Sequence, residues 1–127
     1  MYSETTHGIE VKVVPFYVPE ESDPESGRYL FGYQVTITNQ GGAWAKLLSR
    51  HWIITDGNSH VEEVRGDGVV GLQPELKPGE RFEYTSACPL ATPTGNMRGA
   101  YQVVDELGHR INVKIPLFFL RHPDTFH

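Results

Sequence analysis

Apolar side chains recur at every second position through much of the chain. In the clearest run, Tyr29, Phe31, Tyr33, Val35 and Ile37 take every other place. A period of two places successive side chains on opposite faces of a β-strand. Seven segments show this pattern and are predicted to be strands: 9–13, 29–38, 48–54, 61–64, 81–85, 97–103 and 111–117.

Turn-forming residues mark the breaks between these segments. The stretch 19–27 is acidic and rich in Pro and Ser, and is therefore predicted to be a loop. Asn-Gln-Gly-Gly at 39–42 and Asp-Gly-Asn-Ser at 56–59 suit hairpin turns, as does Leu107-Gly108. Many short strands joined by such turns predict an all-β fold, a β-sandwich of about seven antiparallel strands in two sheets.

The alternation also predicts which side chains face the core. Two of the predicted inward faces are Leu48, Arg50, Trp52 and Ile54 on one strand, and Ile111, Val113, Ile115 and Leu117 on another. Trp52 lies near mid-chain and is expected at the centre of the core. Because a lone buried charge is costly, Arg50 is expected to lie near a sheet edge or to pair with a carboxylate. An anion ligand is the alternative partner for Arg50.

Length and charge limit the kinds of protein and of partner. The 127 residues, 39% hydrophobic and 21% charged, suit one domain (1–127), with a core at about 7–120 and a tail at 121–127. The formal net charge of −5 argues against binding to nucleic acid or to an anionic membrane. We therefore expect neither partner.

Cysteine usage and the N-terminal residues bear on the compartment. Cys88 is the only cysteine, so no intramolecular disulfide can form, and no basic residue or histidine lies within three positions of it. Cys88 is thus expected to be a buried or merely incidental thiol and not a reactive one. Residues 1–7 are polar and lack the apolar region of a signal peptide. We predict a soluble cytoplasmic protein.

One motif suggests ligand binding. Gly66, Gly68 and Gly71 form a G-x-G-x-x-G pattern, which binds dinucleotides when a helix follows it. Pro74 and Pro78 come too soon after it for such a helix, so the dinucleotide interpretation fails. A glycine-rich loop remains, whose amides would bind a phosphate with help from arginine side chains. The candidate arginines are Arg65, Arg50 and Arg98. The alternative is that the glycines only meet backbone demands between strands.

Patterns for other chemistry are weak. Six histidines occur, but no His-x-His or Cys-x-x-Cys spacing typical of zinc sites is present. The tail residues His122, Asp124 and His127 would bind a metal weakly at most. No Gly-x-Ser-x-Gly motif occurs, and neighbouring carboxylates such as Glu62 and Glu63 would face opposite sides of a strand. We predict no metal site, no cofactor, no catalytic residue and no enzyme activity.

Several segments together resemble the ApaG family, also called CorD. They are 47–56 (LLSRHWIITD), 64–74 (VRGDGVVGLQP), 78–86 (PGERFEYTS), 95–101 (GNMRGAY) and 115–120 (IPLFFL). The likeness extends from about residue 7 to residue 120. It implies a sandwich of the fibronectin type III or immunoglobulin type, in agreement with the strands predicted above.

The resemblance also implies a class of function. Bacterial members are associated with cobalt and magnesium resistance, and similar domains in eukaryotic F-box proteins and in a polymerase-interacting protein look like interaction modules. The family carries no agreed catalytic residues. We therefore expect a non-catalytic module with a protein partner. The alternative is binding of a phosphate-containing molecule, such as a nucleotide or pyrophosphate, by loop 66–71.

Overall fold

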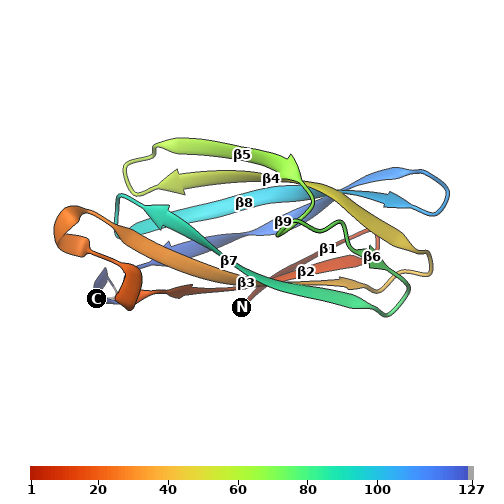
Figure 1. Cartoon of the computed structure of the whole chain (residues 1–127), viewed down its shortest axis with the longest axis horizontal. Helices are drawn as coiled ribbons and strands as arrows, with labels where there is room; N and C mark the ends of the chain where they lie inside the picture. Colours follow the sequence, from red (N-terminus) through yellow and green to blue (C-terminus); the bar gives the residue numbers. More distant parts are fainter. Residues whose placement is uncertain (126–127) are drawn as a thin grey trace.

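The strands of the computed structural model, which describes residues 1–125, form two antiparallel sheets packed face to face (Figure 1). One sheet has the order β1-β2-β3-β7, with strands Tyr2–Thr6, Ile9–Tyr17, Tyr29–Asn39 and Arg81–Leu90. The other has the order β5-β4-β8-β9, with strands Val61–Asp67, Ala45–Asp56, Thr94–Asp105 and Arg110–Arg121. The predicted fold class, an all-β sandwich, is confirmed.

Seven of the strands correspond to the seven predicted segments, and two others were missed. β1 pairs with β2 across Tyr2 to Thr6, and the two-residue β6 (Glu75–Leu76) pairs with β4. β1 has the sequence YSETT, whose inward positions are mostly polar and half-buried, so it lacks the apolar period that identifies a strand. The predicted acidic loop contains two short 3₁₀ helices, η1 (Pro19–Glu21) and η2 (Pro24–Ser26).

Trp52 lies at the centre of the core, as predicted. Its side chain is buried, and its ring centroid lies 5.3 Å from that of Tyr33 and 6.0 Å from that of Phe118. Tyr84 and Tyr101 face each other across the two sheets, and their hydroxyl groups hydrogen-bond together. This contact satisfies two phenol groups that would otherwise be buried without a partner.

The predictions that Leu48 and Leu117 face the core are wrong, and a β-bulge explains each of them. The register between β4 and β8 shifts between Leu47 and Ser49, so Leu47 instead of Leu48 is fully buried. On β9, the three steps from Ile115 to Phe118 lie opposite two steps on β8, from Gly99 to Met97, so Phe118 is buried while Leu117 is 46% exposed. An extra residue in one strand reverses the facing of every later position.

The two lateral sides of the sandwich differ. On one side β1 lies against β9: the Lys114 backbone N–H donates to Thr6 Oγ1 at 3.2 Å, and Lys114 Nζ lies 3.8 Å from Glu4 Oε1. On the other side β5 and β7 are the last strands of their sheets. The sandwich is therefore closed along β1 and β9 and open between β5 and β7.

The C-terminal tail follows β9 directly. β9 ends at Arg121, and a short 3₁₀ helix, η3 (Pro123–Thr125), follows it. Residues 126 and 127, which the predicted tail includes, lie outside the described residues. Within residues 1–125, none of the helices has the length and apolar character needed to cross a membrane.

Candidate functional site

The glycine-rich loop is a tight turn held together by its own backbone. It leaves β5 and runs on to β6 and β7. Val69 and Leu72 exchange backbone hydrogen bonds of 2.8 and 2.9 Å across the turn, and the Gly68 N–H donates to the Leu48 carbonyl at 2.8 Å. Three loop amides are therefore already bonded within the protein.

Each glycine of the motif has a local structural reason. A Cβ on Gly66 would lie 2.8 Å from Nη2 of Arg50, whose guanidinium group lies flat against this backbone. Gly68 has a φ of +63°, and a Cβ there would lie 2.2 Å from the Leu72 carbonyl oxygen. Gly71 has a φ of +79° and forms the centre of the turn with Val70.

Arg50 faces the space between the sheets and braces the loop. Its Nη1 donates to the backbone carbonyls of Asp67 and Gly68, both at 2.9 Å. No ion pair joins Arg50 to any carboxylate of the described residues. Of the partners considered for Arg50, a carboxylate is therefore not found, and two carbonyl oxygens bring partial negative charge to the guanidinium group instead.

The structure does not bring the three candidate arginines together. Arg65 is 73% exposed and lies 3.8 Å from Glu63 on the outer face of its sheet. Arg98 is directly opposite Ile53 on β4, so it also faces outward, whereas Arg50 faces inward. Only Arg50 contacts the loop through the bonds described above.

A cleft of about 280 Å³ lies between the sheets on the open side. Arg50, Trp52 and Met97 line it from the β5-β4-β8-β9 sheet, and Tyr33 and Ser86 line it from the other sheet. The remaining lining residues are Ile54, Glu62, Val64, Ala87, Cys88 and Pro89. The sequence predicted that Trp52 lies in the core, but it could not show that Tyr33, Ser86 and Glu62 meet it there. Strand order is not visible in a pattern of alternation.

Burial keeps two of the four titratable groups that line the cleft, Tyr33 and Cys88, neutral. It raises the pKa of Tyr33, which a hydrogen bond from the Ser86 side chain partly offsets. It raises the pKa of Cys88 to about 11, helped by the negative charge of Glu62. Cys88 is buried, as predicted, and its thiol stays protonated at neutral pH. Arg50 and Glu62 are therefore the charged groups that face the cleft.

The two strands that border the open side differ in how well their edges are protected. β5 carries Glu62, Glu63, Arg65 and Asp67 among its seven residues, and such charges discourage pairing with another chain. β7 has charged residues only at its start, and the stretch 85–88 (Thr-Ser-Ala-Cys) is uncharged. Its free edge is therefore the less protected of the two.

The position of Pro89 shows which residues of β7 direct their backbone N–H and C=O groups toward the free edge. Pro89 is opposite Leu30 on β3, and because it has no N–H it cannot exchange hydrogen bonds with Leu30. Since bonded and non-bonded pairs alternate, Cys88 and Ser86 bond to β3, whereas Ala87 and Thr85 direct their N–H and C=O groups outward. Those outward amides donate no hydrogen bond within the described residues.

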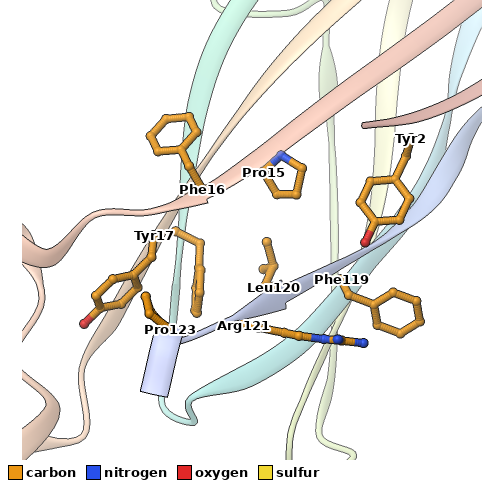
Figure 2. Close-up of a pocket in the computed structure, with 9 residues that line it drawn as sticks. Tyr2, Pro15, Phe16, Tyr17, Phe119, Leu120, Arg121 and Pro123 are labelled. Atoms are coloured by element: carbon orange, nitrogen blue, oxygen red, sulfur yellow. The ribbon is translucent and has the colours of Figure 1, made fainter. Parts of the chain in front are cut away.

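An aromatic groove of about 330 Å³ lies on the closed side, between β2 and the end of β9. Figure 2 shows Tyr2 and Phe119 at one end, Tyr17 and Pro123 at the other, and Leu120 between them. The guanidinium carbon of Arg121 lies 5.4 Å from the centroid of the Phe119 ring. Pro15 also lines the groove, and it removes a backbone donor from the adjacent edge of β2.

In the part of the chain that the structure describes, no group of three or more histidine, cysteine, aspartate or glutamate side chains is arranged so that it could hold a metal ion. His122 and Asp124, two of the tail residues considered above, lie 3.8 Å apart, and His127 is outside the described residues.

The fold and the loop define a β-sandwich domain with a glycine turn braced by an inward-facing arginine. A family model described as the ApaG domain matches residues 19–105. The chain belongs to the ApaG family.

Relatives at high identity extend this match to nearly the whole chain. Protein ApaG of Mesorhizobium japonicum is 53% identical over 125 residues, which is 98% of this chain and 96% of that protein. Protein ApaG of Bordetella pertussis is 56% identical over 121 residues, or 95% of this chain and 92% of that protein. The crystal structure of a Bordetella pertussis protein designated ApaA has a TM-score of 0.89 at 55% identity and covers 97% of both chains.

Proposed function

We propose that this chain is a non-catalytic interaction module, which binds an extended segment of a partner protein as an additional strand beside β7. The observation that carries the proposal is the free edge of β7, where Thr85 and Ala87 direct their backbone N–H and C=O groups away from β3. Such an edge is a template for strand addition, in which main-chain hydrogen bonds supply much of the affinity.

The other edges support this choice by contrast. β1 and β9 lie against each other, the adjacent edge of β2 contains Pro15, and β5 is lined with charges. A partner strand beside residues 85–88 would meet no charged side chain from β7 itself. It would also run along the mouth of the cleft, because Ser86 to Pro89 line that cleft.

Phosphate binding by loop 66–71 has less support. The amides of Gly68, Val69 and Leu72 are bonded within the protein, and Arg50 contacts the loop through carbonyl oxygens, which repel anions. Arg65 and Arg98 lie on the opposite face of the sheet. Phosphate would therefore find few free donors at this turn.

The proposal also bears on the association of bacterial family members with cobalt and magnesium resistance. We attribute that association to the partner protein rather than to a metal site in this chain. We propose the cytoplasm as the compartment, where the thiol of Cys88, the only cysteine, would remain reduced. In a strain lacking this protein, a variant that cannot bind the partner should then fail to restore metal resistance.

The variant Ala87→Pro tests the proposal. Proline removes an edge-facing N–H that β3 does not use, and Pro89 shows that the same edge accepts proline. Affinity capture from lysate with Ala87→Pro should lose the specific partner of the wild type, while Ala87→Ser, which keeps the N–H, should retain it. Equal recovery of that partner by both variants, with both folded by circular dichroism, would contradict strand addition at β7.

A further inference from the structure

Three of the five N–H donors of the Arg50 guanidinium group have no hydrogen-bond partner within the described residues. The bonds from Nη1 go to the carbonyls of Asp67 and Gly68, and no bond from Nε or Nη2 is found among residues 1–125. Nε and Nη2 together form the side of the guanidinium fork that binds a carboxylate or phosphoryl group through two parallel bonds. The loop contacts also hold the group in place, so little entropy would be lost on binding.

The cleft around this fork combines apolar walls with few polar groups. Trp52 and Met97 are buried and line it from one sheet. Tyr33 and Ser86 bring hydroxyl groups from the other sheet, and because the Ser86 hydroxyl donates to Tyr33, the Tyr33 O–H is left to donate to an anion. A concave apolar space with a small number of placed polar groups is the usual form of a small-molecule site.

We propose that the cleft between β5 and β7 binds a small organic anion, whose carboxylate or phosphoryl group pairs with the free side of Arg50 and whose apolar body packs against Trp52. The volume of about 280 Å³ suits a ligand the size of one substituted aromatic ring. This site is separate from the glycine turn, because the ligand approaches Arg50 from the cleft and needs no loop amide.

Glu62 also faces the cleft, and its negative charge should have the opposite effect on anion binding to that of Arg50. Its carboxylate lines the same cleft, and its charge already acts on Cys88. An anion held by Arg50 would be repelled by Glu62, so removing that charge should strengthen binding. A general loosening of the fold would have the contrary effect.

Benzoate, phenyl phosphate and benzyl alcohol are suitable probes, because they share one aromatic ring and differ in the charged group. In an NMR titration of the full chain, at least one anion should shift the amides of Gly66 and Ser86 saturably, while neutral benzyl alcohol should not. The tighter of the two anions identifies a carboxylate or a phosphoryl ligand. Shifts equal for benzyl alcohol, or no saturable shift at about 10 mM of either anion, would overturn the proposal.

Variants then assign the effect to named side chains. Arg50→Gln should weaken binding of the active anion about tenfold or more, and Ser86→Ala, which leaves the loop contacts intact, should weaken it about threefold. Glu62→Gln should strengthen it about two- to fivefold. Arg98→Gln is the matched control, because it removes the same charge from the outer face of the same sheet.

The control should bind within about twofold of the wild type, since an exposed outward charge contributes little. If Arg98→Gln weakened binding as much as Arg50→Gln, or if Glu62→Gln weakened it, the anion would not lie in the cleft. Because Arg50→Gln also removes the brace of the loop, the Ser86→Ala and Glu62→Gln results decide the matter if that variant does not fold. Failure of these tests leaves strand addition at β7 unaffected, and the reverse also holds.

Discussion

Gly68 and Gly71 both have positive φ angles, but only Gly68 has a close neighbour where a side chain would begin. The Leu72 carbonyl oxygen lies 2.2 Å from the Cβ position of Gly68, and nothing lies within 4 Å of that of Gly71. The two positions therefore separate the cost of a left-handed backbone from the cost of steric overlap with the backbone.

Gly71→Ala should lower the free energy of unfolding by about 1 kcal/mol, the cost of a left-handed alanine alone. Gly68→Ala should lower it by at least about 2 kcal/mol more, because backbone atoms must also move. Urea denaturation of both variants measures the difference. An equal loss of unfolding free energy in the two variants would show that the Leu72 carbonyl does not lie close to the Cβ position of Gly68.

Single side chains also show how far the sequence alone can lead. Alternation was enough to place Trp52 in the interior, because burial on a strand depends on local parity. It could not supply the partners of Arg50, since the carbonyls of Asp67 and Gly68 lie 17 and 18 positions away and face Arg50 only once the turn has formed. The contacts of the site therefore depend on long-range geometry.

At the level of the strands, the two β-bulges set which residues reach the core. Leu48 and Leu117 have the parity of core residues in the sequence, yet an extra residue in β4 and another in β9 turn them away. Pro116 lies inside the β9 bulge, a place where proline is tolerated in a sheet. Alternation was enough to predict that these segments are strands. It could not predict which residues of β4 and β9 face the core, because it does not show where a bulge lies.

A matched pair of leucines tests the phase of β9. Leu120 is 1% exposed and Leu117 is 46% exposed. Leu120→Ala should lower the free energy of unfolding by about 2–5 kcal/mol through the cavity it leaves, whereas Leu117→Ala should cost less than about 1 kcal/mol. Chemical denaturation of the two variants compares them directly, and a larger loss for Leu117→Ala would place the bulge elsewhere.

On the scale of the whole molecule, the two lateral sides of the sandwich differ in structure. On the closed side β1 lies beside β9, and on the open side β5 and β7 are the last strands of their sheets (Figure 1). The aromatic groove lies on the closed side, and the cleft lies on the open side. Both proposed binding modes use the open side. A partner strand would extend a sheet at β7, and a small anion would enter between the sheets toward Arg50.

Amide hydrogen exchange tests strand addition most directly. It is measured on the wild-type chain with and without the partner protein that the wild type captures and Ala87→Pro does not. In the free chain, Thr85 and Ala87 should exchange quickly, whereas Ser86 and Cys88, which bond to β3, should exchange slowly. Binding should slow exchange at Thr85 and Ala87 by at least about tenfold. Unchanged exchange at these two amides in the complex, with new protection elsewhere, would contradict the account.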